Sequence, residues 1–354
     1  MAEKLVLLTG ATGFLGYAIL LDLLKSGYRV RVAARSRAKI DKIRAAPSLS
    51  ALNPSATQLM FVIVPDMIAP GAYDDPVQGV DFIIHVAAPV HSGSTLQKEQ
   101  LEELFVMTSV KGSLGILDSA NKTETVKRVV MTSSTVAIAP TEVYSKGINE
   151  HDVIRGPNTR KTVPKPPYES ELQAYCAGKT AALKASEAFS KDEAVKFDLI
   201  SILPSWILGR DELATNIDEL RAGSNGMVIG WLLDGGQSFG VVGNAVLCAD
   251  AARAHVRALD SDIKGNQSFL LNTEANWKDT PGIIKKYFPD AYESGIFKEG
   301  IWHPSVPLRW DISKVQRVLG IELAGFDAII KEVAEQYIEL AKESKQRVSR
   351  YSQH

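Results

Sequence analysis

The residues best placed to carry out chemistry are a tyrosine and a lysine four positions apart, Tyr175 and Lys179, together with a serine upstream, Ser134. Residues four apart on a helix lie on the same face. A lysine ammonium favours the phenolate form of a nearby tyrosine, and so lowers its pKa from about 10 towards neutrality. Such a tyrosine can protonate a carbonyl oxygen while a hydride adds to the carbon. A serine hydroxyl can hold that oxygen in place.

The elements around these residues decide whether the chemistry is plausible, because a tyrosine–lysine pair at this spacing is common on exposed helices. The apolar run 128–131 predicts a buried strand that stops at Thr132, Ser133 and Ser134. Ligands bind at the carboxyl ends of parallel strands, although serines there also serve as turn formers and helix caps. We choose Ser134 as the catalytic hydroxyl and regard Ser133 as its packed neighbour. The pair lies on a helix expected to begin near Ser170.

A glycine-rich turn near the start of the chain gives a second signal. Apolar residues 5–8 predict a strand, and residues 14–24 carry apolar side chains at helical spacing. Between them we expect Gly10 to allow the tight turn, Gly13 to allow close approach of a diphosphate, and Gly16 to bring the helix against the sheet. Free N–H groups at the helix start bind phosphate. The strand, turn and helix together predict a dinucleotide site with the contacts Gly10, Thr12, Gly13, Phe14 and Leu15.

The end of the second expected strand, 29–34, selects the coenzyme. A carboxylate at this point would bind a free ribose 2′-OH, but no Asp or Glu stands here. Arg35 offers a planar donor fork that suits a phosphate, and Lys39 follows one helical turn later. A solvated basic helix start is the alternative interpretation. After a glycine-rich turn, the pattern favours NADPH.

Two further strand ends add candidate contacts. The run 59–64 is followed by Asp66 and Met67, which could bind and cover an adenine ring, although Asp66 could equally cap a helix. The run 81–86 is followed by Ala87 and Ala88, whose small side chains would let a dinucleotide lie against the backbone. His85 within that run is expected to be a packed core histidine, and no histidine is assigned a catalytic role.

Composition argues against nucleic-acid-binding, membrane-spanning, metal-binding and disulfide-rich proteins. The 354 residues contain 40 Lys and Arg against 41 Asp and Glu, so no basic excess suggests a nucleic-acid or membrane surface. The two cysteines, Cys176 and Cys248, form no metal-binding spacing or disulfide framework, and no metal site is expected. No apolar run is long enough to cross a bilayer, and the first strand begins too early for a leader peptide. We therefore expect a cytoplasmic enzyme that acts on a small-molecule substrate.

The second half of the chain alternates less regularly, and substrate contacts are expected there. The loop 149–168, rich in Pro, Gly and charge, is a candidate for setting substrate choice. Apolar periodicity predicts a helix from Phe326 and a strand over 268–271. An apolar substrate pocket is predicted from Val90, Val136, Trp206, Met227 and Trp231.

The combined motifs are similar to those of the extended short-chain dehydrogenase/reductases, in particular the dihydroflavonol-reductase-like branch with microbial NADPH-dependent aldehyde and ketone reductases. The motifs are Thr9 to Gly16, Thr132-Ser133-Ser134, Tyr175-x-x-x-Lys179, Pro204, Arg35 with Lys39, Val64-Pro65-Asp66, residues 249–256 and residues 311–314.

This resemblance implies an α/β fold with a doubly wound parallel Rossmann sheet of about seven strands and a smaller C-terminal substrate-binding lobe. Residues 1–205, with parts of 240–275 returning, would bind NADP, and residues 206–345 would mainly form the lobe. Tyr175 would donate the proton, Lys179 would bind the nicotinamide ribose, and the backbone from Pro204 to Ile207 would lie near the carboxamide. One departure is Ser109, which stands where many members carry an Asn of a water-mediated proton relay.

The sequence therefore predicts an NADPH-dependent reductase of aldehydes or ketones, acting as a monomer or homodimer. A nucleotide-sugar epimerase or dehydratase would use the same three catalytic residues, but those enzymes usually hold NAD beside an acidic strand end, unlike Arg35. A non-catalytic NADP-binding sensor would be expected to lose the tyrosine–lysine pair. Both remain alternatives.

Overall fold

A parallel sheet forms the centre of the molecule. The computed structural model describes residues 4–89, 96–139, 143–144, 147, 152–154, 162–236, 239–298, 300 and 302–351, with side chains as far as residue 344. Within these residues, seven parallel strands lie in the order β10-β6-β5-β4-β1-β2-β3. They are β1 (Leu5–Thr9), β2 (Arg29–Ala34), β3 (Leu59–Ile63), β4 (Phe82–His85), β5 (Arg128–Thr132), β6 (Asp198–Pro204) and β10 (Gln267–Leu271). The predicted doubly wound α/β fold is confirmed.

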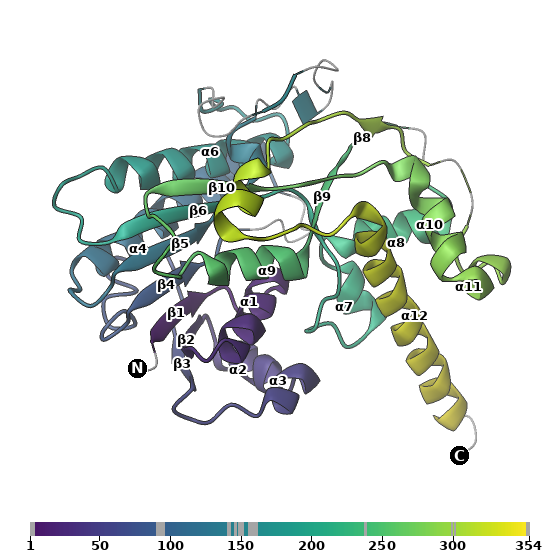
Figure 1. The fold of residues 1–354 in the computed structure, drawn as a ribbon, viewed down its shortest axis with the longest axis horizontal. Coiled ribbons are helices and arrows are strands. Elements are labelled where there is room, and N and C mark those ends of the chain that lie inside the picture. The colour runs from purple at the N-terminus through teal and green to yellow at the C-terminus, as the bar shows by residue number, and fades with distance from the viewer. Residues whose placement is uncertain are drawn as a thin grey trace.

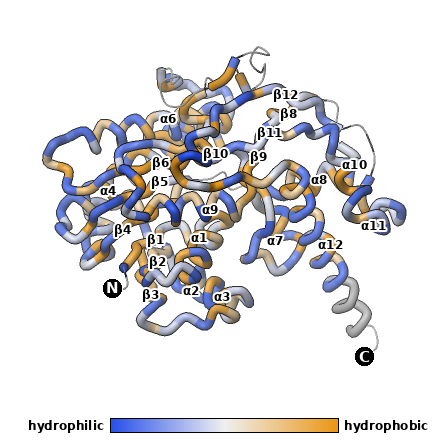
Figure 2. Tube along the Cα trace, viewed as in Figure 1, coloured by the Kyte–Doolittle hydropathy of each residue, from blue (hydrophilic) through white to orange (hydrophobic). Residues whose placement is uncertain are grey.

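Helices cover both faces of the sheet because successive strand residues point to opposite sides. On one face Val6 and Leu8 join a core with α1 (Phe14–Lys25), α2 (Arg37–Arg44), α3 (Pro47–Leu52) and α9 (Cys248–Arg257). On the other face Leu5 and Leu7 join a core with α4 (Thr108–Asn121), and α6 (Glu171–Phe189) packs beside α4. Figure 1 shows these two layers, and Figure 2 shows that the strands between them are largely apolar.

The segment before α4 is not a regular continuation of that helix. A 3₁₀ turn, η1 (Lys98–Gln100), and a π-helix, η2 (Glu102–Met107), precede the α-helix. The wider turn brings the backbone carbonyl of Phe105 against Gly178 of α6, where any Cβ would collide with it. The carbonyl of Glu103 accepts the backbone N–H of Thr108, as the i to i+5 pattern of a π-helix requires, and it also accepts the Thr108 hydroxyl at 2.9 Å.

The remaining chain forms a C-terminal lobe beside the sheet (Figure 1). Its apolar core is built around Trp231 and Trp277. The helices are α7 (Ile217–Arg221), α8 (Asn225–Asp234), α10 (Thr280–Tyr287), α11 (Pro289–Glu293) and α12 (Phe326–Tyr351), with η5 (Trp277–Asp279). The π-helix η6 (Val315–Leu319) packs instead against β10, and its Val315 and Leu319 belong to the core that holds α1 and α9. Two small sheets, β11-β9-β7 and β12-β8, were not predicted; they comprise β7 (Ile207–Leu208), β8 (Val241–Val242), β9 (Asn244–Leu247), β11 (Thr273–Glu274) and β12 (Ser305–Val306).

Candidate active site

Ser134, Tyr175 and Lys179 come together at the carboxyl edge of the sheet. Ser134 follows β5 and caps the 3₁₀ turn η3 (Thr135–Ala137); its Oγ lies 3.4 Å from the carbonyl oxygen of Pro204 at the end of β6. Tyr175 and Lys179 lie on α6, with Lys179 Nζ 5.8 Å from the centre of the Tyr175 ring. The Ser134 hydroxyl interacts with the Tyr175 phenol. The three predicted side chains therefore form one group.

Burial dominates the electrostatics of this group. Burial and the neighbouring Cys176 thiol raise the pKa of Tyr175 to about 12, while the Ser134 hydroxyl opposes them. Burial lowers the pKa of Lys179 to about 8. The expected fall of the tyrosine pKa towards neutrality is therefore outweighed by burial in the protein alone. Near pH 7 the phenol keeps its proton and the amine is mostly charged.

Local contacts fix α6 in place. The Ser170 hydroxyl accepts a hydrogen bond from the backbone N–H of Gln173 at 3.2 Å, so the helix begins where the sequence predicts. Phe105 of η2 meets the Tyr175 ring edge-on at 6.4 Å. Gly178 allows this close packing of η2 on α6. The close packing of η2 on α6 therefore brings Phe105 against the Tyr175 ring.

The glycine-rich turn has the predicted strand–turn–helix form. Gly10 has a φ of 77°, which favours glycine, and a Cβ there would lie 2.7 Å from the backbone nitrogen of Ala87. Gly13 caps α1 and is exposed, and a Cβ there would lie at ordinary contact distance, 3.6 Å, from the carbonyl oxygen of Gly10. A Cβ at Gly16 would collide with the carbonyl oxygen of Gly10, so Gly16 lets α1 pack closely on the turn. Thr12 and Phe14 are half-buried, whereas the Leu15 side chain packs in the core, so only its backbone could face a ligand.

The two predicted phosphate-binding cations stand at the end of β2. Arg35 is exposed and Lys39 is half-buried on the first turn of α2. Neither forms an ion pair with any residue that the structure describes. Their neighbour Arg37 is instead paired with Asp41 at 3.1 Å. Arg35 and Lys39 are therefore available to an anion.

The other predicted cofactor contacts lie along the same edge. Asp66 accepts a hydrogen bond from the backbone N–H of Ile68 at 3.0 Å, and so stabilises a turn rather than capping a helix. Met67, Ala87 and Ala88 line a cavity there. Pro204 ends β6 and the half-buried Ile207 begins β7.

Of the residues predicted to line the substrate pocket, Trp206 and Trp231 are in contact with each other. Trp206 packs edge-on against Trp231 at 5.7 Å, and Trp231 is itself buried in the lobe core. Met227 is 53% exposed on α8, and Val136 is half-buried in η3. Val90 and half of the loop 149–168, namely residues 149–151 and 155–161, lie outside the described residues.

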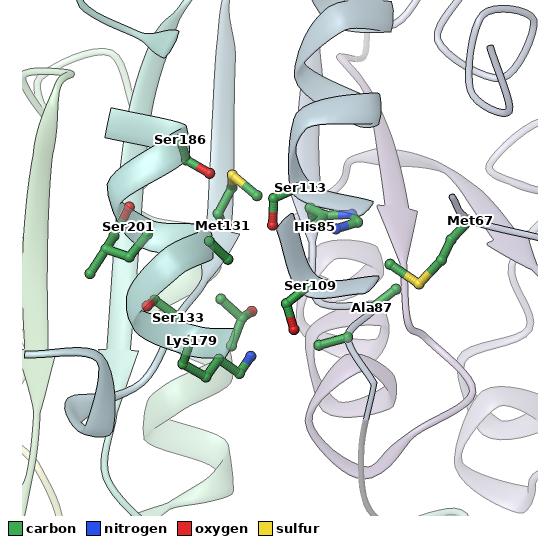
Figure 3. Close-up of a pocket in the computed structure, with 14 residues that line it drawn as sticks. Met67, His85, Ala87, Ser109, Ser113, Met131, Ser133, Lys179, Ser186 and Ser201 are labelled. Atoms are coloured by element: carbon green, nitrogen blue, oxygen red, sulfur yellow. The ribbon is translucent and has the colours of Figure 1, made fainter. Parts of the chain in front are cut away.

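Sequence reasoning missed the cavity that these elements enclose. It lies between the sheet and the helices α4 and α6, and it reaches Lys179 (Figure 3). Five serines line it: Ser109, Ser113, Ser133, Ser186 and Ser201. The histidine at this wall is the expected core residue, since His85 Nδ1 lies 2.9 Å from Thr9 Oγ1. Burial, followed by the charge of Lys179, lowers the pKa of His85 to about 3, which keeps its ring neutral.

The described part of the chain holds neither a metal-binding cluster nor a helix that could span a membrane. No group of three or more His, Cys, Asp or Glu side chains could hold a metal ion there. Within the same residues, every helix is too short or too polar to cross a bilayer.

Comparisons with known proteins identify the family and the fold. The model of the NAD dependent epimerase/dehydratase family matches residues 6–269. Ketoreductase CTB6 of Cercospora nicotianae is 35% identical over 353 residues and is covered to 96%, as is this chain. NAD-dependent epimerase/dehydratase ALT6 of Alternaria alternata is 33% identical, with 96% of this chain and 99% of the relative covered. The crystal structure of Gre2 with NADPH from Candida albicans has a TM-score of 0.79 at 24% identity, with coverage of 96% and 99%.

Proposed function

Because this chain belongs to the NAD dependent epimerase/dehydratase family, we propose that it is an NADPH-dependent oxidoreductase that reduces an aldehyde or ketone to the alcohol. The observation that carries the proposal is the grouping of Ser134, Tyr175 and Lys179 at the carboxyl edge of the sheet. A relative that covers the whole chain is named a ketoreductase, which supports the reaction class.

The three side chains have complementary tasks. NADPH, when bound, supplies the hydride for the carbonyl carbon. Tyr175 gives its phenolic proton to the oxygen, and burial keeps it protonated until then. The Ser134 hydroxyl donates a hydrogen bond to the same oxygen, and the Lys179 ammonium stabilises the phenolate that remains.

The residues around the turn fit a dinucleotide. The exposed backbone at Gly13 and the start of α1 suit a diphosphate, since the first N–H groups of a helix have no partner within it. Arg35 and Lys39, which form no ion pair within the described residues, suit a 2′-phosphate and favour NADPH over NADH. The remaining contacts that we propose are Thr12, Phe14, Leu15, Asp66, Met67, Ala87, Ala88, Lys179, Pro204 and Ile207.

The substrate would enter between the sheet edge and the C-terminal lobe. We assign cofactor binding to residues 1–205 with parts of 240–275, and substrate binding mainly to residues 206–345. Trp206 is the best-supported pocket residue, because it is partly exposed and lies two residues after Pro204, at the end of β6. Val90, Val136, Met227 and Trp231 remain proposed pocket residues.

The proposal is tested by following NADPH absorbance with a panel of aldehydes, ketones and flavonoids. Replacement Tyr175→Phe removes only the proton donor, so kcat should fall about 10²- to 10⁴-fold while NADPH still binds. The matched control is Tyr28→Phe, a half-buried tyrosine before β2, at the opposite edge of the sheet.

Retained turnover in Tyr175→Phe would contradict the proton-donor assignment. A nucleotide sugar included in the panel tests the competing epimerase or dehydratase function. Conversion of that sugar without net consumption of NADPH would overturn the reductase proposal. Tight NADPH binding with no turnover of any compound would instead support a sensor.

A further inference from the structure

A buried histidine of α9, which the proposed reaction does not use, lies behind the strand that leads to the catalytic serine. His255 belongs to the stretch 249–256, one of the motifs singled out in the sequence, and it is fully buried. Its helix packs against α1, which follows the glycine-rich turn, and against β6 (Figure 1). On β5, Val130 and Thr132 share the face that α9 covers, because strand residues two apart point to the same side. His255 therefore lies against the end of β5.

Both ring nitrogens of His255 have partners, and these partners fix the tautomer. Nδ1 lies 2.7 Å from the carbonyl oxygen of Ala251, one turn earlier on α9, and Nε2 lies 2.8 Å from Oγ1 of Thr132. A carbonyl oxygen can only accept a hydrogen bond, so Nδ1 carries the hydrogen. Burial lowers the pKa of His255 to about 4, so the ring is neutral near pH 7 and Nε2 presents a lone pair. The Thr132 hydroxyl therefore donates its hydrogen to His255.

The Ser134 hydroxyl is only loosely bound to the backbone around it. Its contacts with the Pro204 carbonyl and with the Val136 N–H are both 3.4 Å long, which is weak for a hydrogen bond to oxygen. The chain that carries it is held more firmly, since the Ser133 N–H donates to the Ile202 carbonyl at 2.7 Å. The position of the hydroxyl therefore depends on the end of β5.

The region of α9 holds β5 at both ends. Arg128, the first residue of β5, donates to the carbonyl of Ala258 directly after α9. Thr132, the last residue of β5, donates to His255 within α9. This second bond lies two residues before Ser134. It is therefore the bond that acts at the catalytic end of the strand.

We propose that His255 is a positioning residue for the reaction, which holds Thr132 at the end of β5 and thereby places the Ser134 hydroxyl at the carbonyl oxygen of the substrate. Because His255 is fully buried, it acts without contact with substrate or coenzyme. The catalytic part of this inference rests on the proposed function, whereas the bond to Thr132 and the tautomer do not. A histidine with a structural role alone would stabilise the fold without affecting turnover.

The tautomer is tested by nitrogen NMR of the coenzyme-free protein with isotopically labelled histidine side chains. The signals of His255 are identified by their loss in His255→Gln. We expect a protonated Nδ1 and an unprotonated Nε2 that accepts a hydrogen bond. A protonated Nε2 would overturn the proposal, because Thr132 could then not donate to it. This measurement needs no substrate.

Two substitutions of His255 separate its two hydrogen bonds. A glutamine carries its amide to the position of Nε2 and can still accept from Thr132, whereas an asparagine ends near Nδ1 and can bond only Ala251. We expect His255→Asn to lower kcat about 10- to 100-fold, the loss that a small displacement of an aligned group produces. KM for NADPH should change little. His255→Gln should retain most of kcat.

Substitutions of Thr132 test whether His255 acts through this hydroxyl, and they leave α9 intact should His255→Asn fail to fold. Thr132→Val removes the hydroxyl at nearly constant volume and should lower kcat as His255→Asn does. Thr132→Ser keeps a hydroxyl and should stay near the unmodified enzyme. Combining Thr132→Val with His255→Asn should cost no more than either change alone, because both break the same bond. Additive losses would overturn the proposal.

The matched control deletes a buried hydroxyl far from the site. Thr123 donates to the carbonyl of Ser119 at 3.1 Å, after α4 ends and before β5 begins. Thr123→Val should lower the free energy of unfolding, measured by urea denaturation, and leave kcat unchanged.

If His255→Asn and Thr132→Val behave like this control, losing stability but keeping full kcat, the histidine is structural and the proposal fails while the reductase function stands. If the unmodified protein reduces no carbonyl compound at all, the proposed function fails, and the catalytic role of His255 fails with it. The NMR spectrum then still decides whether His255 accepts a hydrogen bond from Thr132.

Discussion

At the scale of single residues, the site separates groups that are neutralised within the protein from groups left free for a ligand. Arg37 is paired with Asp41, whereas Arg35 two positions earlier has no ion pair within the described residues. The two arginines share the same stretch of chain and similar exposure. Only Arg35 stands directly at the end of β2, where the coenzyme ribose would lie.

Arg35→Ala should raise KM for NADPH about 10- to 100-fold, the loss expected for a hydrogen bond to a charged group. NADH has no 2′-phosphate, so its KM should not change. Initial-rate kinetics with each coenzyme measure the two values. Arg37→Ala serves as the matched control, with both constants unaltered. An equal effect of Arg35→Ala on both coenzymes would remove the phosphate role.

At the scale of elements, the approach of η2 to α6 positions the catalytic face. The π-helix places the Phe105 carbonyl against Gly178, one residue before Lys179. A side chain at Gly178 would force the two elements apart. The edge-on contact between Phe105 and Tyr175 depends on the same approach.

We expect Gly178→Ala to lower the free energy of unfolding by about 1–3 kcal/mol, as overpacking does, and to lower kcat through displaced Tyr175. Urea denaturation and kinetics measure the two effects. Gly230→Ala on α8 is the control, because no described atom lies within 4 Å of its added Cβ. That variant should be as stable as the unmodified protein or more stable by up to about 1 kcal/mol. Equal stability of both variants would show that η2 and α6 accommodate a methyl group at Gly178 without cost.

At the scale of the whole molecule, one buried arginine joins distant parts of the chain. Arg128 of β5 binds both carboxylate oxygens of Asp198 on β6, at 2.6 and 2.9 Å. It also donates to the carbonyls of Ala258, Asp260 and Ile263, after α9. The segment that leads back to β10 is therefore tied to the centre of the sheet.

Arg128→Met should destabilise the fold by about 3–5 kcal/mol, because it leaves a partly buried carboxylate and three carbonyls without their shared donor. The free energy of unfolding from denaturant titration measures this. Lys127→Met changes an exposed neighbour whose amine bonds only the Glu124 carbonyl among described residues, and should have little effect. A small loss for Arg128→Met would mean that water replaces the guanidinium at these carbonyls.

Much of the fold was predictable because its signals are local. The apolar runs before Gly10 and Thr132 became β1 and β5, and Ser170 became the cap of α6. The short strands of the lobe were missed because segments of two to four residues carry too little periodicity. The π-helix was missed because nothing in its local spacing marks it. Its Phe105 backbone packs on Gly178, which lies far along the chain.

The amino-acid sequence alone specified the glycine-rich turn, the two basic residues after the second strand and the tyrosine–lysine face. Each of these depends on backbone conformation or side-chain spacing within a few residues. Packing decided the rest. The serines around Lys179 come from α4, the end of β5, α6 and β6, which lie far apart in the chain. No spacing in the sequence relates Ser133 to Ser186. Burial likewise sets the pKa values of Tyr175 and Lys179, since the desolvation of a charge depends on everything packed around it.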